Sequence, residues 1–282
     1  MELRAQIEEL ESALTPAERK LASTLLADYP FAGLQTIQLL ADKTGVSAPS
    51  ITRFVAKLGC QGYQDFQHKL IGELKEWHRS PVELHSKSSH GANFLEAYVE
   101  RASQLVRAVP AALTQVQFER ICGMVADERR AIYLIGGRIS DPIAQHFSRH
   151  LRQIRRDVFH IPPDPEVWPE YILRMKARDV FVVFDFRRYQ PRIEQLVRTA
   201  KQASGIDVLL FTDKWMSPVS SEATEVIALS IDNGTAWDTY IAAMVTMDAM
   251  ITHISERDWD STSSRIRAWD ALRLDKERKP TK

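Results

Sequence analysis

The chain has 282 residues, which suits about two domains of ordinary size. Its 37 basic and 37 acidic residues cancel, so it is not a polycation that coats nucleic acid through bulk charge, and any DNA affinity must come from a local patch. Two cysteines, Cys60 and Cys122, in apolar contexts, a charged N-terminal segment and the lack of a long apolar stretch are not typical of secreted or membrane proteins. We therefore expect a cytoplasmic protein.

Two helices are expected before residue 45. Thr15–Glu18 has the pattern of a capping box with proline at the first helical position, and the helix that it begins should run to about Tyr29, where Pro30 stops it. The leucines expected to face inward on this helix are Leu21, Leu25 and Leu26. Residues 36–44 then predict a short helix that ends at Gly45.

Residues 45–59 have the features of the turn and second helix of a helix-turn-helix. Gly45 can adopt the backbone angles of the turn, Val46 can be buried between the helices, and the Ser47 hydroxyl is expected to accept a backbone amide of the next helix. Apolar residues recur at helical spacing and form one face, made of Ile51, Phe54, Val55 and Leu58. The opposite side carries short donors and two cations, with Pro49, Ser50, Thr52, Arg53, Ala56 and Lys57.

This polar side predicts contacts to a DNA major groove. Ser50, Thr52, Arg53 and Lys57 are the expected contacts to base edges and phosphates, and Ser47 is expected near a phosphate. The alternative is an ordinary amphipathic helix with a solvated cationic face. The neighbouring helices, including one expected from Gly62 toward Trp77, favour the DNA-binding interpretation.

The first third of the chain also resembles a known family. The pattern LTPAERKLASTLL and the run GVSAPSITRFVAKLGCQGYQDFQ are similar to the N-terminal domain of the RpiR family of bacterial transcription regulators. The resemblance covers residues 1–77. It implies a DNA-binding domain that is joined to a C-terminal sugar-isomerase (SIS) domain, which senses phosphosugars.

Residues 78–111 are expected to connect the two domains. The segment 78–91 is polar and rich in breakers, which is typical of a linker, and its three histidines are too loosely spaced to favour a metal site. Two bridging helices are expected, over residues 93–109, closed by Pro110, and over residues 114–127.

The second half alternates apolar strands with helical segments, which predicts an α/β fold with a parallel sheet covered on both faces. The five expected strands are 131–135, 158–161, 179–184, 207–212 and 225–229, and the expected helices are 142–152, one beginning at Pro191, and 235–254. This rhythm favours a flavodoxin-like strand order with a crevice at the carboxyl ends of strands one and three. Residues 112–255 resemble the SIS domain.

The loops of this half depart from the SIS pattern at two of three places. The first loop, G-x-G-x-S in the family, is Gly136-Gly137-Arg138-Ile139-Ser140 here, so an arginine replaces the second glycine. The third-strand loop, S-x-S-G-x-T in the family, is the segment 185–190 and keeps none of the small or hydroxyl residues. The loop after strand four, Thr212 to Pro218, matches T-x-x-x-x-S-P closely.

These replacements predict an anion site built from side chains instead of a glycine-rich phosphate cradle. The residues expected to line it are Gly136, Arg138, Ser140, Asp185, Arg187, Arg188, Gln190, Thr212 and Ser217. In the alternative, the three arginines form structural salt bridges with Asp141 and Asp185 and there is no ligand. Trp215 either stacks on a ligand or belongs to the core or rim.

Other candidate chemistry is weak, and we expect neither a metal nor a cofactor. His146 and His150 have a spacing that can hold zinc but lack a third ligand, and Gly136-Gly137 is an incomplete dinucleotide fingerprint. The tail, residues 256–282, predicts an amphipathic helix that docks on its own domain or on a second subunit. Its apolar residues are Ile266, Trp269 and Leu272.

Three function classes are considered. The first is a transcription regulator, not an enzyme, whose SIS-like domain binds a small anionic metabolite (a phosphosugar or an organic acid) and forms a homodimer or homotetramer on a DNA operator. The second is a sugar-phosphate isomerase with an accessory helical domain. The third is a regulator whose second half only dimerises. The sequence favours the first, because the usual phosphate loop is lost and no base stands out in the crevice.

Overall fold

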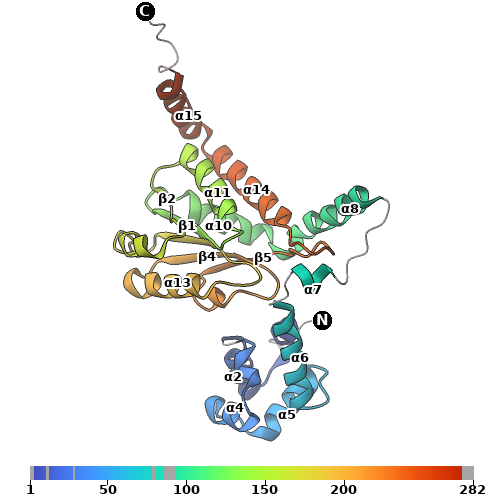
Figure 1. Ribbon diagram of the computed structural model, residues 1–282. Helices are drawn as coiled ribbons and strands as arrows, with labels where there is room; N and C mark the ends of the chain where they lie inside the picture. The colour runs from blue at the N-terminus through green and yellow to red at the C-terminus, as the bar shows by residue number, and fades with distance from the viewer. Residues whose placement is uncertain (1–2, 11–12, 28, 78–80, 86–92, 275–282) are drawn as a thin grey trace, which may run out of the picture. The chain divides into compact units, whose positions relative to one another are not determined.

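The computed structural model describes residues 3–10, 13–27, 29–77, 81–85 and 93–274. The chain divides into two compact units, Met1–Arg79 and Ser80–Lys282, which are taken separately below (Figure 1). No helix in these described ranges combines the length and the apolar character needed to cross a bilayer.

The first unit is entirely helical. Its helices are α1 (Leu3–Glu9), α2 (Pro16–Ala27), α3 (Phe31–Leu34), α4 (Ile37–Thr44), α5 (Ala48–Lys57) and α6 (Tyr63–Trp77). Fully buried side chains from α2, α4, α5 and α6 form one core, which includes Leu21, Leu25, Leu40, Ile51, Phe54 and Phe66. Leu26 packs against this core but is only half-buried. The expected order of helices is confirmed, with α1 and α3 added.

The capping box of α2 forms as expected. The backbone N–H of Thr15 donates to Glu18 Oε2 at 3.0 Å, and the N–H of Glu18 donates to Thr15 Oγ1 at 3.4 Å. The helix ends at Ala27, two residues earlier than the expected Tyr29. Thr36 caps α4 by accepting from the N–H of Leu39 at 3.2 Å.

The second unit contains a five-stranded sheet in which all neighbours are parallel, with the order β2-β1-β3-β4-β5. The strands are β1 (Ile132–Gly136), β2 (Val158–His160), β3 (Val180–Phe184), β4 (Asp207–Thr212) and β5 (Glu225–Ala228). In the central pairing, Ile132 is opposite Val180 and Gly136 is opposite Phe184, so β1 and β3 end at the same level. The predicted flavodoxin-like order is confirmed.

Helices cover both faces of the sheet (Figure 1). The helices after residue 93 are α8 (Phe94–Arg107), α9 (Val109–Ala112), α10 (Gln115–Ala126), α11 (Asp141–Ile154), α12 (Trp168–Ile172), α13 (Pro191–Ser204), α14 (Ile241–Arg257) and α15 (Trp259–Leu274), with short 3₁₀ turns at Pro165–Val167 and Pro218–Ser221. Strand side chains alternate between the two faces because successive residues point in opposite directions. Phe181 and Val183 pack with Leu196 of α13, whereas Phe184 meets Phe147 of α11 edge to face at 6.5 Å.

Three expectations about elements are wrong. The segment expected as a plain linker contains a short helix, α7 (Pro81–His85), while 78–80 and 86–92 lie outside the described residues. Pro110 sits in the first turn of α9 instead of closing the previous helix, where its missing N–H costs nothing. The last predicted helix begins at Ile241, not at residue 235. The helix expected in the tail does form, as α15, which begins at Trp259.

The tail helix α15 packs on its own unit along its first half. Arg265 Nε donates to the carbonyl of Arg152 at 2.9 Å, and Thr262 is buried. Its second half is more open: Trp269 and Leu272 are exposed, with Arg273 over the Trp269 ring. Docking on the same subunit therefore accounts for one half of the helix only.

Candidate functional site

The helix-turn-helix of the first unit is formed by α4, a tight turn and α5. Gly45 has φ +66° and donates its N–H to the carbonyl of Ala41 at 2.8 Å, which ends α4 in a left-handed cap. Val46 is buried after it. The apolar residues of α5 point into the core with exposed fractions of 0 to 4%, namely Ile51, Phe54, Val55 and Leu58.

The outer side of α5 carries the residues expected to contact DNA. Thr52, Arg53 and Lys57 are exposed, and Ser50 is half-buried. Ser47 occupies the N-cap position, but its hydroxyl lies 3.0 Å from Ser50 Oγ and makes no cap bond to a backbone amide, contrary to expectation. Arg53 Nη2 donates to the same Ser50 Oγ at 2.9 Å. A connected polar row of Ser47, Ser50 and Arg53 therefore faces outward.

Lys57 is held in a way that the sequence did not predict. Its ammonium lies 2.5 Å from Glu18 Oε1 on α2, while the other Glu18 oxygen closes the capping box. The hydrogen bond from Lys57, together with the capping bonds, lowers the pKa of Glu18 to about 2. Lys57 is consequently paired with an internal carboxylate, whereas the Arg53 guanidinium donates to the neutral hydroxyl of Ser50.

A second cation reaches the turn from α2. A Cβ placed on Gly45 would lie 3.3 Å from Lys20 Nζ, so the Lys20 ammonium sits directly beside the turn between α4 and α5. Sequence reasoning missed Lys20 because this proximity is a tertiary contact between helices 25 residues apart, and no local pattern signals it.

At the carboxyl edge of the second unit's sheet, the first loop is tied to β3. Ser140 Oγ donates to the carbonyl of Phe184 at 2.6 Å and accepts from the N–H of Gly137 at 2.8 Å. A Cβ on Gly136 would lie 2.5 Å from the backbone N of Asp141, so this glycine allows α11 to begin close to β1. Gly136 and Ser140, the two residues of this loop that match the SIS pattern, therefore have structural roles.

Asp185 joins four of the expected residues into a buried cluster. Ser217 Oγ donates to Asp185 Oδ2 at 2.5 Å, and the N–H of Gln190 donates to Asp185 Oδ1 at 3.4 Å. Thr212 Oγ1 accepts from the N–H of Ser217 at 3.0 Å. Burial raises the pKa of Asp185 to about 7, because the carboxylate is removed from water.

Asp213, which the sequence analysis did not select, is the second buried carboxyl at this edge. It accepts from the N–H of Arg187 at 2.5 Å, from the N–H of Trp215 at 3.0 Å and from the hydroxyl of Tyr189 at 2.6 Å. Burial raises its pKa to about 6, while these donors favour the anion. Its position directly after a buried strand was the available signal.

Of the three arginines, only Arg187 is inside the protein. Its side chain is 1% exposed and forms a two-point ion pair with Asp238, through Nη2 to Oδ1 and through Nε to Oδ2 at 3.3 Å. Its guanidinium carbon lies 4.8 Å from the centre of the Trp215 ring. Arg138 and Arg188 are exposed, and Arg188 has φ +68°.

The expected structural salt bridges do not form as stated. Arg187 pairs with Asp238, and Asp141 lies 2.7 Å from His160 Nε2. Trp215 is 5% exposed, so it belongs to the core beneath Arg187 and not to a rim.

Two family models of known proteins match the chain. The model described as a helix-turn-helix domain of the rpiR family matches residues 1–76, and the SIS domain model matches residues 124–253. The chain belongs to the RpiR family. The uncharacterized HTH-type transcriptional regulator in the aarA 3' region of Providencia stuartii is 22% identical over 212 residues, covering 74% of this chain and 73% of that protein.

Other similarities extend over one unit or show the fold. The bifunctional protein glk of Burkholderia mallei is 42% identical over 70 residues, which is 24% of this chain and 11% of that protein, so this chain spans about a tenth of it. The NanR protein of Vibrio vulnificus, solved in complex with ManNAc-6P, has a TM-score of 0.54 at 17% identity and covers 96% of this chain and 98% of its own. Its likeness establishes the shared fold.

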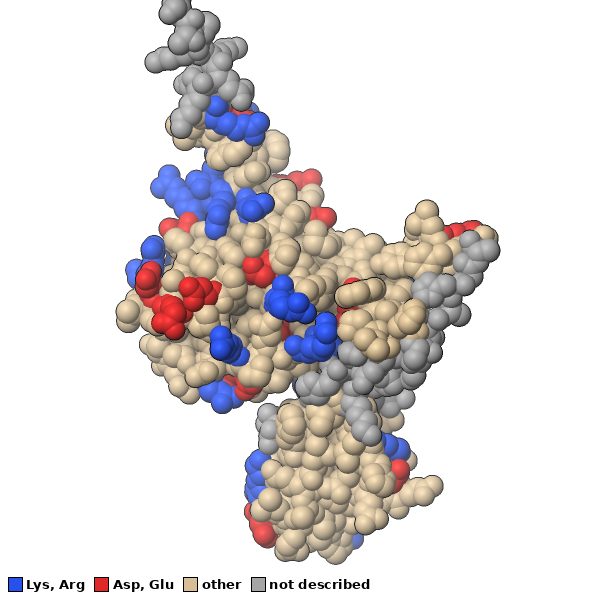
Figure 2. Space-filling view, in the orientation of Figure 1, with Lys and Arg blue, Asp and Glu red and all other residues tan. Residues whose placement is uncertain are grey.

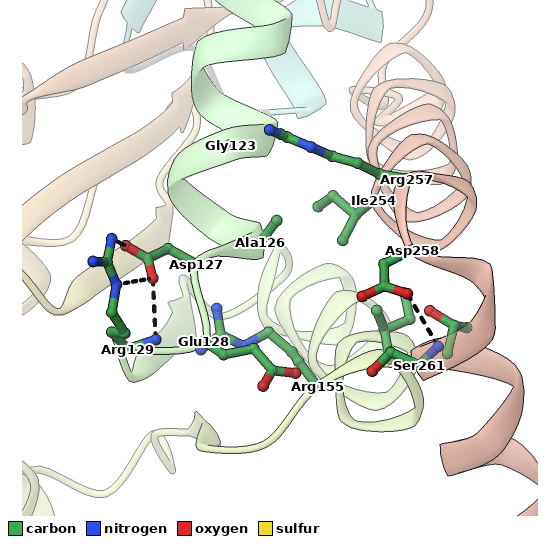
Figure 3. A pocket seen from close by; sticks show the side chains of 12 residues that line it. Gly123, Ala126, Asp127, Glu128, Arg129, Arg155, Ile254, Arg257, Asp258 and Ser261 are labelled. Atoms are coloured by element: carbon green, nitrogen blue, oxygen red, sulfur yellow. Dashed lines mark hydrogen bonds and ion pairs between the residues drawn. The ribbon is translucent and has the colours of Figure 1, made fainter.

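The second unit of this RpiR-family chain also has a pocket that none of the residues described above for the carboxyl edge of the sheet lines (Figure 3). A pocket of about 490 Å³ lies between the end of α10, the end of α11 and the junction of α14 with α15. Arg129 pairs there with Asp127, Asp258 accepts from the N–H of Ser261, and Arg257 extends toward Gly123 (Figure 3). No residue expected from the sequence to bind a ligand lines this part of the described structure.

The histidine pair expected to be weak as a metal site lies on α11 of the SIS domain. The rings of His146 and His150 are 4.6 Å apart, and His146 Nε2 is 3.4 Å from Asp248 Oδ1. Within the described ranges, no group of three histidine, cysteine, aspartate or glutamate side chains is placed to hold a metal ion.

Proposed function

We propose that this chain is a transcription regulator that binds an operator through α5 and its turn, acts in the cytoplasm and does not catalyse a reaction. The observation that carries the proposal is the two-sided character of α5. Its apolar face is fully buried, and its outer face carries Thr52 and the Arg53 guanidinium without burying them. Such a helix is a common major-groove reader.

The proposed DNA contacts divide by role. Arg53 is placed to reach base edges, with Ser50 and Thr52 beside it, and Ser47 lies where a phosphate would approach the start of α5. We add Lys20 as a phosphate contact because its ammonium lies beside the turn. We give Lys57 a smaller part than the sequence indicates, since Glu18 already neutralises it.

Charge on the surface supports recognition by local contacts. On the face drawn in Figure 2, lysines and arginines form small groups that are separated by neutral surface and by acidic side chains. A DNA reader that makes few cationic contacts gains affinity when a second reader of the same assembly binds beside it. We propose that the second unit forms a homodimer or homotetramer on a near-palindromic operator. We divide this unit into a connecting segment, an SIS-like domain and a tail, which are residues 78–111, 112–255 and 256–282.

We also propose that the SIS domain binds a small anionic metabolite, a phosphosugar or an organic acid, at the carboxyl edge of its sheet. Arg138, Arg187 and Arg188 are cations of that edge. An isomerase would need a base free to act on a bound sugar. Two of the buried carboxyls there, Asp185 and Asp213, are instead occupied by hydroxyl and backbone donors, which supports a binding role over catalysis.

Selection of duplexes from a random pool by the full chain tests the proposal. We expect enrichment of two half-sites whose centres are one helical turn apart or a multiple of it. Recovery of unenriched DNA at modest salt would contradict it. Sugar phosphates and organic acids added to the bound complex should change its dissociation, and incubation of the same compounds with the chain should yield no isomer.

A further inference from the structure

The segment between β5 and α14 carries an acid that reaches a buried arginine. Asp238 forms the two-point ion pair with Arg187, whose side chain is 1% exposed. Thr239 N–H donates to the carbonyl of Ile231 at 2.8 Å, which closes the segment into a loop. Residues 235–240 have a helix-compatible sequence, yet they remain outside α14. The ion pair gives a physical reason for this departure from the helix.

Arg187 has more donors than its partner uses. Asp238 accepts from Nε and Nη2, whereas Nη1 is buried and has no hydrogen-bond partner among the residues that the structure describes. Asn233, on the same segment, is 1% exposed, and neither its amide nitrogen nor its amide oxygen has a partner in the described structure. Buried polar groups without partners are costly, so this segment is not fully satisfied in its present arrangement.

The frame around the guanidinium is rigid apart from that segment. Trp215 lies beneath it, 4.8 Å from the guanidinium carbon. Asp213 holds the backbone N–H of Arg187 and that of Trp215, which fixes the loops after β3 and β4 relative to each other. Trp215 therefore covers one face of the guanidinium, and the Asp238 carboxylate occupies the edge that carries Nε and Nη2. A guanidinium in such a frame binds carboxylate or phosphate oxygens through paired hydrogen bonds.

We propose that Arg187 is the anion-binding residue of the SIS domain and that Asp238 is its internal competitor. A small effector anion displaces the Asp238 carboxylate, takes its two hydrogen bonds and also reaches Nη1. This inference rests on the proposed function, in which the second unit responds to an anionic metabolite. Displacement frees residues 235–240, and since α14 begins at Ile241, the change reaches the start of that helix.

An internal competitor sets the concentration at which the effector acts. The apparent affinity is the intrinsic affinity reduced by the fraction of molecules in which the site is open. Removal of the Asp238 charge should raise this fraction. The variant should then bind simple anions that the wild-type chain binds weakly.

The test uses the full chain and inorganic phosphate, with acetate as a second probe and sodium chloride at matched ionic strength as the baseline. Thermal midpoints are measured for the wild type, Asp238→Asn, Arg187→Met and the double variant. We expect phosphate or acetate to raise the midpoint of Asp238→Asn in a saturable way, with a dissociation constant at least tenfold below that of the wild type. The double variant should show no saturable rise.

Asp248→Asn is the control, because it removes an exposed carboxylate of the same unit, on α14, whose Oδ1 lies 3.4 Å from His146 Nε2. It should behave as the wild type. If Asp238→Asn does not fold, Asp238→Ser is used with the same criteria. A preference for phosphate over acetate assigns phosphate esters as effectors, and equal or better binding of acetate assigns carboxylates.

Equal anion responses in Asp238→Asn, the double variant and the wild type would overturn the proposal that Asp238 competes with an anion for Arg187. The proposed regulator fails in a different way. If no member of the set, the wild type included, binds any enriched duplex, the DNA-binding role is lost while the anion result stands. If DNA binding is intact and the anion response is absent, only the inference about Arg187 and Asp238 is lost.

Discussion

Glu18 links the first turn of α2 to the last turn of α5, and its ionisation should be visible in the stability of the first unit. Its pKa of about 2 in the folded chain lies below the value of about 4.3 in an unfolded chain. The stabilisation is therefore complete above about pH 5 and is lost as the pH falls toward 2. Glu18→Gln should lower the unfolding free energy at pH 7 by about 1–2 kcal/mol.

Urea unfolding followed by circular dichroism between pH 2 and pH 7 measures this effect. The Glu18→Gln chain should lose the part of the acid sensitivity that the wild type shows between pH 5 and pH 2. Glu9→Gln, an exposed carboxylate at the end of α1, serves as the control and should leave the profile unchanged. An unaltered acid profile in Glu18→Gln would mean that Lys57 is not held as described.

Asp185 should have the opposite pH dependence. Burial raises its pKa to about 7, above the value of about 3.9 in the unfolded chain, so the folded chain binds the extra proton between these values. Stability contributed by the neutral form is present below about pH 4 and declines as the pH rises toward 7. Asp185→Asn should remove this decline and make the second unit more stable than the wild type at pH 8. A steeper decline, measured by urea unfolding, would contradict the assignment.

At the scale of elements, local signals predicted what they control. The cap of α2, the left-handed Gly45 and the apolar spacing of α5 all act within a few residues, and each formed as expected, although the Ser47 cap did not form. The strands were predicted because buried parallel strands are continuous apolar runs. The start of α14 was not predicted. Asp238 pairs with Arg187, which is 51 residues distant in the sequence, and so lies outside the helix.

The candidate site was predictable in location but not in its use. Flavodoxin-like topology brings the ends of β1 and β3 together, and Ser140, Asp185, Arg187 and Ser217 do lie at that edge. Their hydrogen-bond partners come from other loops, so a single sequence does not reveal that most are already occupied. Whether these residues bind a ligand stays a prediction.

Gly45 offers a test of the turn between α4 and α5. Its φ of +66° disfavours any side chain, and a Cβ there would also press on Lys20 Nζ at 3.3 Å. Gly59 has a similar φ of +68° and nothing within 4 Å of its virtual Cβ, which makes it a matched control. Each alanine variant should cost about 1–2 kcal/mol of unfolding free energy. Only Gly45→Ala should weaken DNA binding further, as measured by fluorescence anisotropy. Equal DNA affinities would argue against a role for this turn.

At the scale of the whole molecule, the proposed assembly places several readers on one operator. Sedimentation of the chain with the enriched duplex should give two or four chains per operator. Lys20→Ala should reduce the slope of log affinity against log salt by about one for each reader, because each lost phosphate contact retains its counterion. A single chain per operator, or a salt slope that Lys20→Ala leaves unchanged, would contradict this arrangement.

The most direct test of the DNA-binding claim compares two affinities in the wild type and in Arg53→Ala. One duplex carries the enriched operator, and the other carries the same bases in scrambled order. The wild type should prefer the operator by about a thousandfold or more at physiological salt. Arg53→Ala should lose about 1–3 kcal/mol at the operator and little at the scrambled duplex. If Arg53→Ala keeps both the affinity and the preference of the wild type, α5 is not the element that reads the operator.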